Sequence, residues 1–230
     1  MFPTMLAILS DIDWFPLWLS LRVAAIATGL SLAVGLALAY LLARFRFRGR
    51  DVLDALITLP IVLPPTVLGY YLLVLLGRNS ALGQTFEAVF GSPLVFTWQA
   101  AVLAAMLHSV PLLVKSARAA LESVDRSLEN AARTLGASEA RVFFKVTLPL
   151  AGNSILAATA FAFARALGDF GVTIMIAGNI PGRTQTMAVA IYDAVQSGRS
   201  GPALVMVLII SATTLAILYL TSRLQREALH

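Results

Sequence analysis

The residue types that carry most enzyme and metal chemistry are scarce in this sequence. It has no cysteine and only two histidines among 230 residues. This excludes disulfides, thiol catalysis and cysteine-ligated metals, and it leaves too few histidines for a typical zinc site. The motifs G-x-x-x-x-G-K-[ST], H-E-x-x-H and G-x-S-x-G are also absent. The sequence therefore predicts a chain that is not an enzyme and that holds no cofactor and no metal.

One close pair of opposite charges lies in a hydrophobic stretch. Arg165 and Asp169 are four residues apart, so they share a helix face and can pair if the helix continues past Gly168. Paired charges in a membrane are usually structural or face a pathway, which makes both residues pathway or gate candidates. The pair lies near a predicted span end, which argues against a self-powered carrier. His108 is expected near the cytoplasmic end of its span, where a hydrogen-bonded packing histidine fits as well as a functional one.

These residues lie in an unusually apolar chain. It is 59% hydrophobic and 13% charged, with mean hydropathy +0.84, whereas soluble domains contain about 25% charged residues. A helix needs about 20 apolar residues to cross a bilayer. We therefore expect an all-α integral membrane protein with one domain, 1–230. The predicted spans are about 15–43, 52–76, 94–114, 148–168 and 202–220. Residues 170–201 are expected to be external or partly re-entrant, although a further span over 170–197 is the main alternative.

Basic residues predict the orientation of the spans. Arg44, Arg46, Arg48 and Arg50 directly follow the first predicted span, and cytoplasmic loops are enriched in Lys and Arg. The N-terminus is then outside and the C-terminus is cytoplasmic. This orientation places twelve Lys and Arg residues inside and three, Arg78, Arg183 and Arg199, outside. A nucleic-acid or anionic-lipid patch is a less favoured explanation of the four arginines, and we expect no nucleic-acid partner.

The second predicted span contains three prolines in six residues, Pro60, Pro64 and Pro65, followed by Thr66. Proline removes a helical hydrogen bond and clashes with the preceding turn, so this helix must kink or break. Broken helices at membrane depth occur where they are buried in protein or line a cavity. These four residues are therefore pathway or gate candidates, with a purely structural hinge as the alternative.

A long polar passage, residues 129–149, interrupts the apolar chain. Apolar residues recur through it at helical spacing between basic ones, and the orientation above puts it in the cytoplasm, within a loop over 119–147. An amphipathic segment of this kind can dock in a groove on a soluble partner. We expect it to present an apolar face made of Ala131, Ala132, Leu135 and Val142.

This passage resembles the signature loop of permeases from ATP-binding-cassette (ABC) importers. That pattern is Glu-Ala-Ala, three residues, Gly, nine residues, an aliphatic residue, one residue and Leu-Pro. The sequence has Asn130-Ala131-Ala132, Gly136, Val146 and Leu148-Pro149 at these places. Asn130 thus stands at the usual Glu position, with Glu129 one residue earlier. Leu59–Pro65 with Gly69-Tyr70, Gly168–Gly171 and Asn179–Thr184 are similar to the molybdate branch of this family.

The resemblance implies the five-span core of type I importers with a cytoplasmic coupling helix, in a bacterial inner membrane. It also implies a homodimer in lipid, two cytoplasmic ATPase subunits and a periplasmic oxyanion-binding protein. Sulfate/thiosulfate and tungstate permeases are the nearest alternatives, and an autonomous channel or secondary carrier is a more distant one. The residues expected to couple the chain to the ATPase are Glu129, Asn130, Ala131, Ala132, Arg133, Leu135, Gly136, Ala137 and Arg141.

Overall fold

The computed structural model describes residues 13–227, and every regular element among them is helical. The helices are α2 (Phe15–Arg44), α3 (Arg50–Val62), α4 (Pro65–Leu76), α5 (Ala81–Phe90), α6 (Trp98–Glu122), α7 (Arg126–Thr134), α8 (Glu139–Val142), α9 (Leu148–Leu167), α10 (Gly171–Ile176), α11 (Met187–Gln196) and α12 (Ser200–Glu227). A π-helical turn, Phe143–Thr147, joins α8 to α9. The N-terminus, which we expect outside the membrane, lies beyond the described residues.

Long apolar helices form the body of the molecule. Within residues 13–227, four helical stretches are long and apolar enough to cross a membrane: α2, α6, the continuous α8–α9 stretch and α12. Helices α3 and α4 pass the same test only as a bent pair, which brings the number of candidate spans to five. The prediction of an all-α membrane protein is therefore confirmed.

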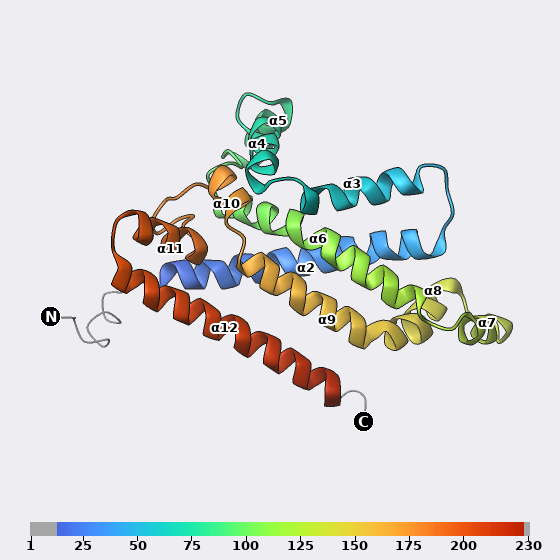
Figure 1. Cartoon of the computed structure of the whole chain (residues 1–230). Helices are drawn as coiled ribbons and strands as arrows, with labels where there is room; N and C mark the ends of the chain where they lie inside the picture. Colours follow the sequence, from blue (N-terminus) through green and yellow to red (C-terminus); the bar gives the residue numbers. More distant parts are fainter. Residues whose placement is uncertain (1–12, 228–230) are drawn as a thin grey trace.

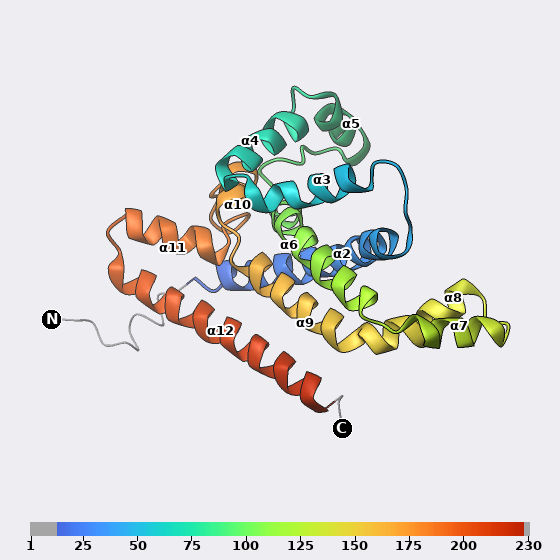
Figure 2. The ribbon, with the colours of Figure 1, turned by 45° about the vertical axis from the view of Figure 1, so that its right-hand side comes forward.

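Helices α2, α6 and α9 pack side by side as the centre of the fold (Figures 1 and 2). Alanines dominate their contact: Ala24, Ala27, Ala101, Ala104 and Ala105 are all buried. Lipid tails are as apolar as leucine, so membrane helices associate through close packing, which small side chains permit. Helix α12 lies against α9 and α11 at one side of this centre.

The prolines break the second predicted span, as expected. Helix α3 ends at Val62, α4 starts at Pro65, and their axes differ by 113°. Helix α4 then packs on α10. A side chain at Gly171 would place its Cβ 2.5 Å from the Cβ of Pro65, so this contact requires glycine.

Two helices differ from the predicted segments. Helix α5 lies between the second and third predicted spans. It forms because Ser80 caps its first turn, accepting a hydrogen bond from the amide of Gly83 at 2.8 Å. Helix α6 continues past residue 114 to Glu122 because its charged residues have partners; Lys115, for example, donates to Asp54 at 2.8 Å. His108 lies near the middle of this longer helix.

Helices α10 and α11 occupy the section predicted as external or re-entrant. They have 6 and 10 residues, and each is too short to cross a bilayer core of about 30 Å by itself. Helix α11 begins at Met187. Its first residue is held to α2, because the Met187 amide donates to Ser20 Oγ at 2.7 Å.

A buried polar cluster joins α6 to the break between α9 and α10. Asp169 is only 3% exposed, and its Oδ1 lies 2.7 Å from Nδ1 of His108. Its Oδ2 accepts hydrogen bonds from the Thr173 amide at 3.2 Å and from the Thr173 hydroxyl at 2.6 Å. Arg165 reaches Oδ1 at 3.4 Å, so the predicted pair does form. The carboxylate starts α10 and fixes it to α6.

We expect Asp169→Ala to destabilise the fold by about 1–3 kcal/mol or more, because it leaves polar groups of His108 and Thr173 buried without their acceptor. Asp193→Ala is the matched control, since Asp193 also pairs with an arginine, Arg199 at 2.7 Å, but in an exposed position. Exposed pairs contribute about 0–1 kcal/mol. Unfolding of the purified chain in increasing dodecyl sulfate measures both. Similar losses for the two variants would contradict a structural role for the buried cluster.

Candidate coupling site

Helices α7 and α8 project beyond the ends of the long helices, at one end of the molecule (Figure 2). Asp125 caps α7, because its Oδ1 accepts a hydrogen bond from the Ser127 amide at 2.8 Å. That hydrogen bond holds the pKa of the Asp125 carboxyl below its ordinary value, so the cap is charged at neutral pH. Ser138 caps α8 with a weaker bond to the Arg141 amide at 3.4 Å. The predicted cytoplasmic segment is thus two short capped helices.

The turn between the two helices depends on Gly136. Its φ of 81° lies in the left-handed region, which glycine adopts without steric cost. The Gly136 amide donates to the Arg133 carbonyl at 2.9 Å, and the Ala137 amide donates to the Ala132 carbonyl at 3.1 Å. This pair of bonds is the Schellman motif that ends helices at glycine. It gives a physical role to one of the residues singled out from the sequence.

The turn presents an apolar side chain to solvent. Leu135, at the tip of this turn, is 88% exposed, and the neighbouring Ala131 is also exposed. Ala132 and Ala137 are half-buried. Leu135 is therefore accessible for a contact with another protein. Val142, which we expected on the same face, is buried, so that expectation is wrong. The reason is that α8 runs directly into the π turn and α9, which directs Val142 toward the core.

Arg133 fastens α7 to α8. Its guanidinium donates two hydrogen bonds to the Glu139 carboxylate, at 2.7 and 3.0 Å, and a third to Asn130 Oδ1 at 2.9 Å. These bonds lower the pKa of Glu139 and raise that of Arg133, so both remain charged across the physiological range. Asn130, at the position where the signature loop has Glu, therefore braces the arginine through its amide oxygen. Arg141 is exposed on α8.

Glu129 has a different environment from the other predicted coupling residues. It is 2% exposed, and its Oε1 forms a salt bridge with Arg44, the last residue of α2. The same oxygen accepts a hydrogen bond from Thr147 Oγ1 at 2.6 Å. Arg44 also donates to the carbonyl of Leu121, at the end of α6, at 3.2 Å. Glu129 thus ties α7 to the ends of α2 and α6 and to the start of α9, and it faces inward, away from a docking partner.

Glu129, Arg44 and Thr147 form a buried cluster, which we call the Glu129 knot. The sequence does not predict two of its members. The sequence pattern gives Arg44 only as one of four arginines that predict topology, and it assigns no role to Thr147. The available signal was weak: Glu129 precedes the motif residue Asn130 on α7, and no spacing rule links it to Arg44, which is 85 residues away.

The predicted pathway residues fall into two groups. Pro65 contacts Gly171, two residues after Asp169, so the structure brings the helix break and the Arg165–Asp169 pair to one region. Pro64 and Thr66 lie exposed beside this contact. Pro60 lies apart from them, lining an apolar pocket of about 390 Å³ between α3 and α6.

We expect Glu129→Ala to destabilise the chain by about 3–5 kcal/mol, since it leaves the Arg44 guanidinium largely buried and unpaired. Glu139→Ala is the control, because it removes a carboxylate from the same segment at an exposed position and is expected to change unfolding little. Dodecyl sulfate unfolding measures both variants. Equal behaviour would show that the knot does not hold the segment.

Comparison with known proteins agrees with this arrangement. Residues 29–229 match the family model "Binding-protein-dependent transport system inner membrane component". The molybdenum transport system permease protein ModB of Escherichia coli strain K12 is 46% identical over 92% of this chain and 93% of its own. The sulfate transport system permease protein CysT of Salmonella typhimurium is 34% identical over 94% of this chain and 83% of its own.

Solved structures show the same fold at lower identity. A chain of the inward-facing MetNI methionine ABC transporter superposes with a TM-score of 0.74 and 17% identity, covering 99% of both chains. A chain of a bacterial ABC transporter for alginate superposes with a TM-score of 0.73 and 15% identity, covering 97% of this chain and 82% of its own. The fold and the family match lead to the same assignment. The chain belongs to the inner membrane components of binding-protein-dependent ABC transport systems, a family of multi-pass permeases without catalytic activity that work with an ATPase and a binding protein.

Proposed function

We propose that this chain is the permease of an ABC importer that moves molybdate into the cytoplasm, driven by ATP hydrolysis on a partner subunit. The observation that carries this proposal is the 46% identity, over almost the whole of both chains, to the molybdenum permease of Escherichia coli. The identity to a sulfate permease is lower, at 34%. Sulfate is therefore the second candidate substrate, since it is also a tetrahedral dianion.

The projecting end of the molecule is the cytoplasmic side in this proposal. It carries the arginine-rich turn after α2 and helices α7 and α8. Three other arginines lie toward the other end, in the connections between α4 and α5, α10 and α11, and α11 and α12: Arg78, Arg183 and Arg199. The excess of cations at one end supports this orientation by the positive-inside rule. A homodimer would then present two copies of α7 and α8 to two ATPase subunits, and the opposite face would receive the periplasmic binding protein.

Coupling in this proposal has two parts with separate residues. Leu135 and its neighbours contact the ATPase, and Gly136 gives the turn its shape. Glu129, Arg44 and Thr147 then transmit the movement of α7 to the ends of α2, α6 and α9, because a buried hydrogen-bonded ion pair moves as one unit. The substrate pathway would include the region where Pro65, Arg165 and Asp169 meet.

Reconstitution tests the proposal. The chain, its ATPase and its binding protein are incorporated into proteoliposomes, and uptake of labelled molybdate is followed with and without ATP. We expect accumulation only with ATP and with both partners, and stronger competition by tungstate than by sulfate. Molybdate flux through the chain alone would indicate a channel or secondary carrier. Uptake of sulfate in preference to molybdate would replace the proposed substrate.

We expect Leu135→Asp to lower ATP-driven uptake roughly tenfold or more, because an apolar contact at the centre of an interface can contribute 2 kcal/mol or more. Co-purification of the ATPase with the permease should fall in parallel. Leu82→Asp is the matched control: Leu82 is exposed on α5, away from the coupling segment. Normal uptake and ATPase binding in Leu135→Asp would remove this residue from the coupling site.

A further inference from the structure

A basic pocket lies beside helices α7 and α8, the proposed coupling segment. It does not include Leu135 and its neighbours, which form the proposed contact with the ATPase. It has a volume of about 460 Å³ and forms where the turn after α2 meets α3, α6 and α7. Its lining side chains are mostly arginines from separate parts of the chain. They are Arg44, Arg46, Arg50 and Arg126, together with Ala43, Phe45 and Glu122.

The positive charge of this pocket is only partly neutralised. Its single lining carboxylate, Glu122, is bonded to Arg118 at 2.9 Å and lies 3.7 Å from Arg50. Glu129 neutralises Arg44 from the other side of the guanidinium. Within the described part of the chain, Arg46 and Arg126 have no carboxylate partner. The pocket therefore keeps an excess of about two positive charges.

Arg50 also has a donor without an acceptor. One of its terminal nitrogens donates to the Leu42 carbonyl at 2.6 Å, but its Nε is buried and has no hydrogen-bond partner in the structure. A buried donor that lacks an acceptor destabilises the fold. Guanidinium groups match phosphate oxygens in geometry and charge. The guanidinium groups of Arg46, Arg50 and Arg126, which line the pocket, therefore suit it to an anion that carries several oxygens.

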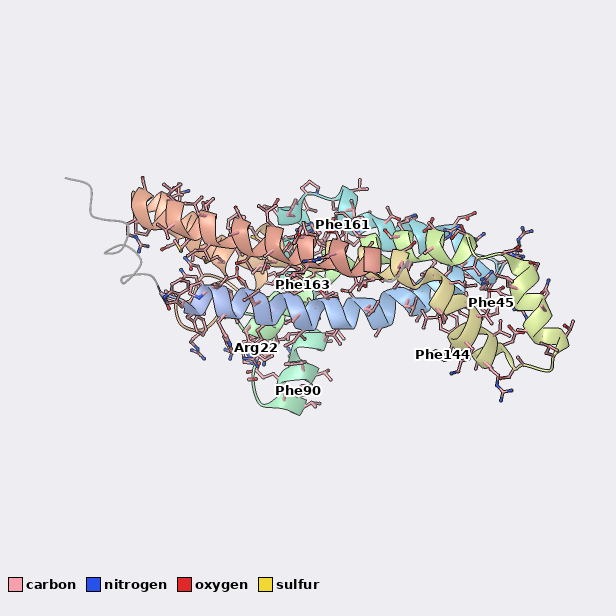
Figure 3. The ribbon with its side chains drawn as sticks, turned by 90° about the horizontal axis from the view of Figure 1, so that it is seen from below. Arg22, Phe45, Phe90, Phe144, Phe161 and Phe163 are labelled. Carbon is pink, nitrogen blue, oxygen red and sulfur yellow. The ribbon has the colours of Figure 1, made fainter. Side chains whose placement is uncertain are left out.

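The place of the pocket in the fold favours a lipid over a dissolved anion. Arg44 is the last residue of a membrane-crossing helix, so the pocket lies at the expected boundary between bilayer and cytoplasm. Phe45 is 52% exposed and Phe47 39% exposed in the turn that borders it; Figure 3 shows Phe45 at this end of the molecule. Aromatic rings prefer the membrane interface, and basic pockets beside spans on the cytoplasmic side bind lipid headgroups.

We propose that this pocket binds the phosphate headgroup of an anionic phospholipid from the cytoplasmic leaflet. The headgroup bridges Arg46, on the turn after α2, and Arg50, the first residue of α3, to Arg126, the first residue of α7. The lipid therefore ties the coupling segment to the bilayer beside the Glu129 knot, with which the pocket shares Arg44. This site does not depend on which oxyanion the permease carries.

The test measures lipid binding directly. The assembled transporter is purified in detergent, stripped of lipid, and titrated with short-chain phosphatidylglycerol while native mass spectrometry counts bound molecules. Phosphatidylcholine and inorganic phosphate are titrated in parallel. We expect phosphatidylglycerol to bind with at least fivefold higher affinity than either. Arg46→Gln and Arg126→Gln should each weaken its binding about fivefold, the effect of removing one cation near a headgroup.

Two other cations serve as matched controls. Arg48 belongs to the same arginine-rich turn and Lys145 to the same end of the molecule, but neither lines the pocket. Arg48→Gln and Lys145→Gln should change phosphatidylglycerol binding less than twofold. Equal weakening by all four variants would mean diffuse attraction and would overturn the proposal.

Three further results would also overturn it. Inorganic phosphate binding as tightly as phosphatidylglycerol would make this a site for a free anion. Equal binding of phosphatidylcholine would remove the selectivity for anionic lipid. Loss of the ATPase from Arg126→Gln, with phosphatidylglycerol binding unchanged, would assign the surface to that subunit. Because the readout is bound lipid, failure here is distinguishable from failure of molybdate uptake.

Discussion

The salt bridge between Glu129 and Arg44 is the interaction on which the projecting end of this protein, helices α7 and α8, depends. The carboxylate comes from a short polar helix and is bonded to Arg44 at the end of α2 and to Thr147 at the start of α9. Arg44 donates in turn to the carbonyl of Leu121 at the end of α6. A buried charge is tolerated only when it is paired and hydrogen-bonded, so each partner enforces the position of the others. The salt bridge therefore fixes the position of α7. The turn that carries Leu135 follows this helix directly, although the turn itself is exposed.

A second buried and hydrogen-bonded carboxylate, Asp169, lies toward the opposite end of the bundle. Asp169 is buried where α9 ends, and it is satisfied by His108 and by both polar groups of Thr173. The two buried carboxylates thus stabilise the two places where a long helix gives way to a short one. Between them the contacts are mostly between alanines, which allow close approach but provide few directional constraints.

Local signals in the sequence were enough to predict much of this. The arginines after the first span, the three prolines and the spacing around Gly136 each act within a few residues, and the structure has a helix end, a break and a helix-terminating turn at these places. The missed contacts are all long-range. Arg44 meets Glu129 across 85 residues and His108 meets Asp169 across 61. Tertiary packing alone decides such pairings.

The π turn at Phe143–Thr147 sets the rotational phase between the coupling segment and its span. An α-helix turns by about 100° per residue, and a π turn accommodates an extra residue without breaking the helix. With that residue in place, Thr147 faces the carboxylate of Glu129. A homologous chain with one residue fewer here could keep the same length of apolar helix in α9. Its α8 would, however, be rotated about the axis of α9 by about 100°. The length of this stretch is therefore constrained by angle and not by membrane thickness.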